Sequence, residues 1–252
     1  MNHHLTIRAL GLLGCALLGG CGSSETSAVE QGQKLFETKA LSPSTLNDYS
    51  CVSCHDVQAS NPPSEKPGAP LAGAYLRPSF WGGQEVDLLR AVNACRNYFM
   101  AASQPLTAED RDARALYAYL ESLPSNGDAE AEQPFTIVNP ITRLTNVTGD
   151  AGRGIVLYTQ ACSTCHGEMH DGRGRLSTRV PILPEDTFNE PTHVNFSAND
   201  FRLTFIEKMR HGLFLDYGGV MPPFSAETLS DQDVSDLLQA LGVLGSPVAD
   251  GL

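Results

Sequence analysis

The spacing of apolar residues along the chain predicts short amphipathic helices that recur in two similar sets. Apolar positions follow one another at helical intervals near residue 113 and again near residue 234, so each run would turn one face to a core. Thr107 and Ser230 precede these runs as candidate N-caps, with acidic residues in the next turn. A further helix is predicted from Asp200 to His211. The two apolar stripes are Ala113, Leu116, Tyr117 and Leu120, and Val234, Leu237, Leu238 and Leu241.

The start of each set carries one repeated pattern, a glycine followed by a leucine and an aromatic residue. It spans Gly32 to Phe36 in the first set and Gly154 to Tyr158 in the second. A helix places the glycine and the aromatic side chain on the same face, where a second helix can cross closely. The sequence therefore predicts an internal repeat, with the first and last helix of each unit crossing.

Each unit also contains the pattern C-x-x-C-H, which is typical of covalent attachment of a c-type haem. The two thiols add to the vinyl groups of the porphyrin, and the histidine becomes the proximal iron ligand. A single C-x-x-C is also typical of zinc or redox sites, but two copies in the same wider frame favour haem. We therefore expect two covalently bound haem c groups, held by Cys51, Cys54 and His55 and by Cys162, Cys165 and His166.

A proline follows each histidine at the same distance, as Pro70 after His55 and Pro181 after His166. A backbone carbonyl near each proline is expected to accept the Nδ1 proton of the histidine and to orient its ring. Tyr75, Arg77 and Trp81 follow the first proline as candidate hydrogen-bond donors to the haem propionates.

The order, spacing and types of these residues resemble the class I cytochrome c fold, twice over. The resemblance implies an all-α protein with two tandem cytochrome c-like domains, at residues 29–123 and 150–246. Residues 124–149 are polar and acidic with scattered prolines, so we interpret them as an irregular linker. Ile137 and Val138 are the linker residues expected to pack as an extended strap.

The second axial ligand decides the chemistry, and the second domain offers the clearer candidate. Met221 is followed by Pro222 and Pro223 and resembles the family's distal methionine loop. Met209 is expected in the core. His193 and His211 are weaker candidates for the axial ligand than Met221. A methionine ligand raises the potential and fills the last open position on the iron, as in an electron carrier.

In the first domain, Met100 and Cys95 are alternative ligands. Residues five apart on a helix point about 140° away from each other, so both should not face the iron. Met100 matches the placement of Met221. The segment around Cys95 resembles the ligand stretch of the di-haem thiosulfate dehydrogenases and the related sulfur-oxidation cytochromes. The lead from Leu35 to Cys51 also looks like the start of bacterial di-haem peroxidases. These resemblances imply an alternative function, an oxidoreductase with the first haem as its catalytic site.

The amino terminus resembles a bacterial lipoprotein signal. Arg8 precedes an apolar run from Ala9 to Leu18 that is too short to span a bilayer, and the run ends in Leu-Gly-Gly before Cys21. We expect a signal at residues 1–20, lipid attachment at Cys21 and a tether at residues 21–28. An ordinary cleaved signal is the alternative. Both place the protein outside the cytoplasm, on the periplasmic side of the cell envelope.

The 252-residue chain has a net charge of −12 and a pI of about 4.9. An acidic surface argues against nucleic acid as a partner because phosphates repel it. It allows docking with basic redox proteins, although such a surface also keeps an exported protein soluble. The sequence thus predicts a di-haem cytochrome c that carries single electrons and is tethered to a membrane by its lipid.

Overall fold

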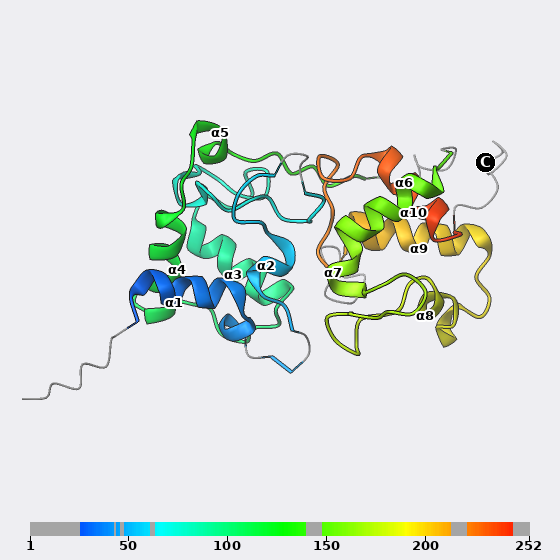
Figure 1. Cartoon of the computed structure of the whole chain (residues 1–252), viewed down its shortest axis with the longest axis horizontal. Helices are drawn as coiled ribbons and strands as arrows, with labels where there is room; N and C mark the ends of the chain where they lie inside the picture. The colour runs from blue at the N-terminus through cyan, green and yellow to red at the C-terminus, as the bar shows by residue number, and fades with distance from the viewer. Residues whose placement is uncertain are drawn as a thin grey trace, which may run out of the picture.

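The computed structural model describes residues 26–42, 44–45, 48–60, 64–139, 148–212 and 221–243. These residues form two helical lobes that lie side by side (Figure 1). Among them there is no β-strand, only an isolated bridge between Phe80 and Glu85, so the predicted all-α class is confirmed. None of the helices described here is long and apolar enough to cross a membrane. Cys21 and the predicted signal lie outside the described residues.

The first lobe contains four helices, and a fifth, short helix follows it. They are α1 (Ala28–Glu37), α2 (Cys51–Cys54), α3 (Leu88–Tyr98), α4 (Arg111–Ser122) and α5 (Gly127–Glu130). The second lobe contains α6 (Ala151–Leu157), α7 (Ser163–His166), α8 (Glu185–Phe188), α9 (Ala198–Arg210) and α10 (Asp231–Ala240). Short 3-10 turns occur at Lys39–Leu41, Ala74–Leu76 and Pro191–His193, and a π turn at Tyr158–Cys162 joins α6 to α7.

Each lobe is built on a crossing between its first and last helices, as the repeated glycine predicts. Helix α1 packs against α4, and α6 packs against α10. A Cβ atom at Gly32 would overlap the carbonyl oxygen of Ala115, and one at Gly154 would overlap that of Asp236. Only glycine therefore permits the two backbones to approach this closely.

Both lobes have their own hydrophobic core, and the predicted stripes of α4 and α10 are buried in them. The exception is Tyr117, which is half-buried, whereas Tyr119 packs against Phe36 with ring centroids 5.5 Å apart. The first cluster includes Leu35, Phe36, Leu41, Tyr49, Leu116 and Leu120, and the second includes Leu157, Tyr158, Phe205, Ile206, Met209, Leu237 and Leu238.

The N-cap of α10 is Ser230, as predicted, and its hydroxyl accepts from the amide of Asp233 at 3.2 Å. The predicted N-cap at Thr107 is wrong, because α4 begins at Arg111 with Asp110 as its N-cap. The amide of Thr107 donates to the Asp110 carboxylate at 2.6 Å, which closes a turn ahead of the helix. Helix α9 begins two residues earlier than predicted, since Ser197 and Asp200 form a capping box before it.

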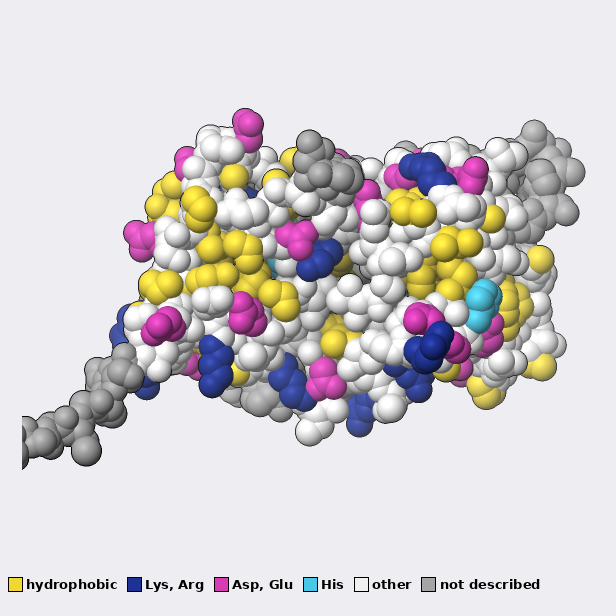
Figure 2. All heavy atoms as spheres, in the orientation of Figure 1, with side chains coloured by type: hydrophobic (Ala, Val, Ile, Leu, Met, Phe, Trp, Pro, Cys, Tyr) yellow, Lys and Arg dark blue, Asp and Glu magenta, His cyan; other side chains and the backbone are white. Residues whose placement is uncertain are grey.

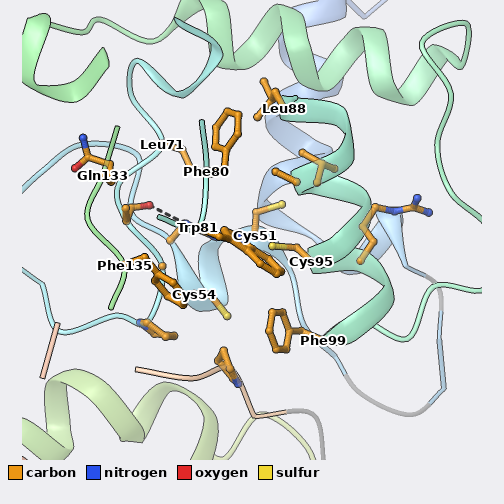
Figure 3. Close-up of a pocket in the computed structure, with 18 of the residues that line it drawn as sticks. Cys51, Cys54, Leu71, Phe80, Trp81, Leu88, Cys95, Phe99, Gln133 and Phe135 are labelled. Carbon is orange, nitrogen blue, oxygen red and sulfur yellow. Dashed lines mark hydrogen bonds between the residues drawn. The ribbon is translucent and has the colours of Figure 1, made fainter. Parts of the chain in front are cut away.

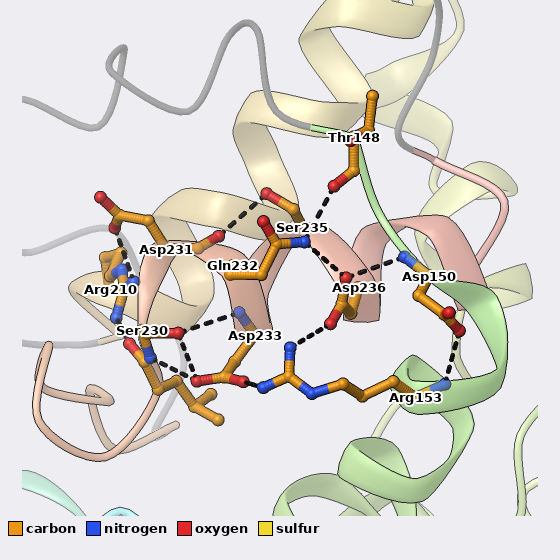
Figure 4. Close-up of polar contacts among 11 residues, drawn as sticks. Thr148, Asp150, Arg153, Arg210, Ser230, Asp231, Gln232, Asp233, Ser235 and Asp236 are labelled. Carbon is orange, nitrogen blue, oxygen red and sulfur yellow. Dashed lines mark hydrogen bonds and ion pairs between the residues drawn. The ribbon is translucent and has the colours of Figure 1, made fainter.

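A buried carboxylate reinforces the crossing in the second lobe (Figure 4). Asp236 is 1% exposed, accepts from the amide of Asp150 and the side chain of Gln232, both at 2.8 Å, and pairs with Arg153. Arg153 also pairs with Asp233. Because a buried charge is costly without partners, this network fixes the register of α6 on α10.

Residues 131–139 of the linker pack as an extended strap that contacts both lobes. Phe135 lies against Trp81 of the first lobe, with ring centroids 6.5 Å apart. One residue later, the amide of Thr136 donates to Glu227 of the second lobe at 2.8 Å. Val138 is 2% exposed, as expected for a strap, and its carbonyl lies 2.9 Å from His211 Nε2. The strap therefore fixes the lobes to each other at several points.

The Gly154→Ala substitution should destabilise the second lobe by about 1–3 kcal/mol or more, since its methyl group would overlap the backbone of α10. Gly152→Ala in the same helix is the matched control. Its Cβ meets only the Asp150 carboxylate, at 3.3 Å, so it should be neutral or stabilising by about 0.5–1 kcal/mol. Thermal unfolding of both variants tests this, and equal melting temperatures would contradict the close crossing.

Candidate haem-binding sites

The first lobe contains a cavity between α2, α3 and α4 that is lined mostly by apolar side chains. Cys51 and Cys54 of α2 and Cys95 of α3 all line it, together with His55 (Figure 3). Its walls include Phe36, Leu71, Trp81, Leu88, Val92, Phe99, Leu116 and Leu120. The cavity thus combines the predicted attachment residues with an apolar enclosure in the centre of the lobe.

The attachment motif takes its shape from one helical turn. Residues three apart lie on the same face of a helix, so Cys51 and Cys54 both reach the cavity. Ser53 turns back to the start of the turn, where its hydroxyl accepts from the amide of Ser50 at 3.1 Å. His55 then leaves the helix in an extended conformation, with φ of −122°.

In both lobes a backbone carbonyl holds the histidine through Nδ1. His55 Nδ1 lies 2.7 Å from the oxygen of Ala69, and His166 Nδ1 lies 2.8 Å from that of Pro181. The expected support is therefore confirmed, with the acceptor one residue before Pro70 in the first lobe. Burial lowers the pKa of both imidazoles, which favours the neutral form. When Nδ1 carries the proton, Nε2 keeps its lone pair for a metal.

The loop that supports His55 is itself fixed. Arg77 is 9% exposed and donates to the carbonyls of Pro70, Ala72 and Ala129 at 2.6, 3.1 and 2.8 Å. It therefore holds the loop beside His55, whereas the sequence suggested a propionate donor. In the second lobe, Arg175 donates to the carbonyl of Val180, next to Pro181, at 3.2 Å.

Met100 and Cys95 both line the first cavity. The helical argument that separates them does not apply, because α3 ends at Tyr98 and Met100 lies beyond it. Met100 is 6% exposed. Burial, and to a smaller extent the nearby Cys51, raises the pKa of the Cys95 thiol to about 12.

Met221 is half-buried and packs against the core of the second lobe, whereas Gly218 to Val220 lie outside the described residues. The chain that follows is fixed where the Phe224 amide donates to Met209 O at 2.7 Å. Met209 is 5% exposed, as expected for a core residue.

The two other histidines considered as ligands, His193 and His211, are engaged by their surroundings. His211 contacts Glu207 through Nδ1 and the carbonyl of Val138 through Nε2. His193 Nδ1 lies 2.8 Å from the carbonyl of Thr187, and its ring stacks on Phe196 at 4.2 Å. These contacts agree with the prediction that both histidines are weaker ligand candidates than Met221.

Two families match this chain, one for each lobe. Residues 29–124 match the family described as cytochrome c, and residues 149–239 match the family described as cytochrome c oxidase, cbb3-type, subunit III. The chain is a di-haem c-type cytochrome. Its two cytochrome c domains imply two covalently bound c-type haems.

The cytochrome is also similar to thiosulfate dehydrogenases. The protein of that name from Stutzerimonas stutzeri (strain A1501) is 26% identical over 170 residues, which cover 64% of this chain and 53% of the relative. The structure of thiosulfate dehydrogenase from Marichromatium purpuratum aligns at 20% identity with a TM-score of 0.41, over 85% of this chain and 45% of that one. The cytochrome thus spans about half the length of these relatives.

The residues of the first cavity fit a covalently attached porphyrin. They supply two thiols on one turn, an oriented imidazole and apolar walls for the macrocycle. The Ser79 hydroxyl lines the same cavity, is buried and has no hydrogen-bond partner. Because buried hydroxyls are rarely left unpaired, Ser79 is suited to a polar edge of the bound group.

Sequence reasoning missed buried Arg96 and the positive φ angles of Trp81 and Ala101 beside the first site. Arg96 is 8% exposed and donates to the carbonyls of Leu41 and Gln104 at 2.9 and 3.1 Å. Trp81 and Ala101 have positive φ angles of 56° and 52°, which are costly for residues with a Cβ. The contact of Arg96 with Leu41 is distant in sequence and has no local signal, whereas Trp81 lies in the turn that Phe80 and Glu85 close.

The Gly68→Ala substitution should displace the His55 ring, because a Cβ at this position would overlap the imidazole. We expect loss of the low-spin ferric signal of the first haem, with that of the second unchanged. Gly127→Ala is the control, since a Cβ there has no neighbour within 4 Å. Electron paramagnetic resonance of both variants tests this, and a normal first-haem signal in Gly68→Ala would contradict it.

Proposed function

We propose that this di-haem cytochrome carries single electrons outside the cytoplasm, with Met100 and Met221 opposite His55 and His166. Haem iron supplies the chemistry, by changing between the ferrous and ferric states. Two thioether ligands would leave neither iron an open position for a substrate. The chain's own contribution is to choose these ligands, bury the macrocycles and space them.

The observation that carries this proposal is the matching support around the two methionines. A buried arginine near the end of the preceding helix ties down the segment that follows each one. Arg96 donates to Gln104 O beyond Met100, and Arg210, which is fully buried, donates to Leu229 O at 2.6 Å beyond Met221. Both methionines are thus held between a helix end and a fixed segment, as a permanent ligand requires.

The charges near the first cavity also favour a carrier. An enzyme acting on a small anion needs a cation available to bind it. Arg77 and Arg96, which line the cavity, donate to backbone carbonyls. Nearby Lys66 pairs with Asp56 at 2.9 Å and donates to Val52 O. These three cations are therefore engaged in holding the chain.

The second candidate is an oxidoreductase of the thiosulfate dehydrogenase type, with the first haem as its catalytic site. The position of Cys95 favours it, since this thiol faces the cavity beside Cys51 (Figure 3). The name of the Stutzerimonas relative points the same way. The two functions differ in which sulfur binds the first iron.

Replacing Cys95 by Ser should leave both ferric low-spin signals unchanged, whereas Met100→Leu should abolish the signal of the first haem. Leucine matches methionine in volume but offers no sulfur, so the second variant removes only the ligand. Met221→Leu is the matched variant for the second haem. Electron paramagnetic resonance with a redox titration measures all three.

The opposite pattern would favour the enzyme. A first-haem signal that changes in Cys95→Ser and persists in Met100→Leu, together with reduction of the wild-type cytochrome by thiosulfate, would overturn the carrier assignment. A peroxidase would instead consume hydrogen peroxide with a reduced donor.

We propose that a lipid on Cys21 tethers the cytochrome to a membrane on the periplasmic side of the envelope. The apolar run that ends in Leu-Gly-Gly before Cys21 supports this. Its redox partners would present basic surfaces to a chain with a net charge of −12. On the face seen in Figure 2, acidic and basic side chains are interspersed. Docking would therefore depend on the net charge of the protein rather than on a single charged patch.

The Cys21→Ser variant should move the cytochrome from the detergent phase to the aqueous phase in a phase-partition assay, because one diacylglyceryl anchor is lost. Cys15 lies inside the apolar run of the expected signal. Cys15→Ser is therefore the control and should remain in the detergent phase. A wild-type protein found in the aqueous phase would contradict the tether and leave the ordinary cleaved signal.

A further inference from the structure

The two haem sites meet at the boundary between the lobes. Helices α2 and α7, which carry the attachment motifs, face each other there (Figure 1). Cys165 of α7 and Leu176 both pack against the core cluster of the first lobe. Pro222 and Pro223, directly after Met221, line the cavity of the first lobe. The second lobe therefore forms part of the wall of the first site.

Tyr49 connects the two sites at this boundary. Its side chain is 6% exposed, lines the first cavity and lies two residues before Cys51. Its hydroxyl donates a hydrogen bond to the sulfur of Cys165 in the second attachment motif. One tyrosine thus contacts residues of both haem sites.

The hydroxyl is suited to act as a permanent donor. Burial raises the pKa of Tyr49, so the phenol stays protonated. Cys165 is a thiol in this structure and stands for the thioether that joins the haem. A thioether sulfur keeps its lone pairs and still accepts a weak hydrogen bond.

We propose that Tyr49 is the bridge through which electrons pass between the two haem sites of this cytochrome. This inference rests on the carrier function proposed above. One electron leaves the ferrous iron of one site and reduces the ferric iron of the other. No bond forms or breaks and no proton moves, because Tyr49 is neither oxidised nor deprotonated. Its ring packs at the boundary between the two lobes. Its hydroxyl bonds the second attachment motif and so keeps that motif against the first cavity.

The same contact should tune the second site. A hydrogen bond to the Cys165 sulfur withdraws electron density from the second haem, so the ferrous state there is favoured. Tyr49 belongs to the first lobe, and among the contacts described for Cys51 and Cys54 no side chain donates to either sulfur; only the backbone N–H of Cys51 does so, to its own sulfur. The contact therefore acts unequally on the two potentials.

The Tyr49→Phe variant of the holoprotein tests the bridge, since it keeps the ring and removes only the hydroxyl. Electron equilibration between the haems after rapid photoreduction should be slower than in the wild type, because the hydroxyl contact that joins the two sites is lost. The potential of the second haem should fall, and that of the first should stay unchanged. Transient absorbance and a spectroelectrochemical titration measure the two effects.

Tyr119→Phe is the matched control. Tyr119 is 7% exposed and belongs to the same core cluster, but it packs against Phe36, and the hydrogen bond to the Cys165 sulfur comes from Tyr49. This variant should retain the wild-type rate and both potentials. Leu176 packs on the first lobe beside Cys165, and its amide donates to the Cys165 carbonyl at 2.9 Å. Leu176→Ala should loosen the contact between the Cys165 sulfur and the Tyr49 hydroxyl, so it should also slow equilibration.

The outcomes separate this inference from the carrier function. A Tyr49→Phe variant with two attached haems and wild-type rate and potentials would overturn the bridge. If that variant loses a haem, Leu176→Ala decides, and an unchanged rate overturns the bridge. Failure of the wild-type haems to exchange electrons with a soluble mediator would instead overturn the carrier function.

Discussion

Each lobe of this cytochrome must build its core around a cofactor rather than around side chains alone, and the remaining structure follows from that constraint. Each domain has fewer than about 100 residues, a size at which side chains alone bury a limited apolar surface. The helices cross through glycines at Gly32 and Gly154, which brings the first and last helices together at the edge of the lobe. In the first lobe, the helices enclose a cavity that is lined by apolar side chains and by the residues of the attachment motif.

Buried arginines fix loop segments in both lobes. Arg77, Arg96 and Arg210 each donate to backbone carbonyls of two or more residues. A guanidinium carries several donors in a fixed plane, so one side chain can hold several loop carbonyls at once. The loop that supports His55 and the segments that follow the two methionines thus have defined positions, although the described residues form no sheet.

The sequence was most informative where the chemistry is local. The attachment motifs, the glycine crossings and the stripe of α10 could be predicted because spacing alone determines them. The choice between Cys95 and Met100 could not, since the argument required both to lie on one helix and α3 ends before Met100. The cap of α4 was missed because Asp110 bonds back to Thr107, a contact that depends on turn geometry. The role of Arg77 was predicted as that of a propionate donor, because its acceptors include Ala129, which is distant in sequence and could not be foreseen.

The arrangement of the two lobes could not be inferred from either repeat, because it depends on residues outside the repeated frame. The strap places Phe135 on Trp81 and bonds Thr136 to Glu227, so one linker segment contacts both lobes within two residues. His211, at the end of α9, bonds the strap again at Val138. These contacts fix the second lobe over the first cavity, where Pro222 and Pro223 complete the wall. Two copies of a simple haem domain thereby become one unit, since neither the first cavity nor the boundary around Tyr49 is complete in one lobe alone.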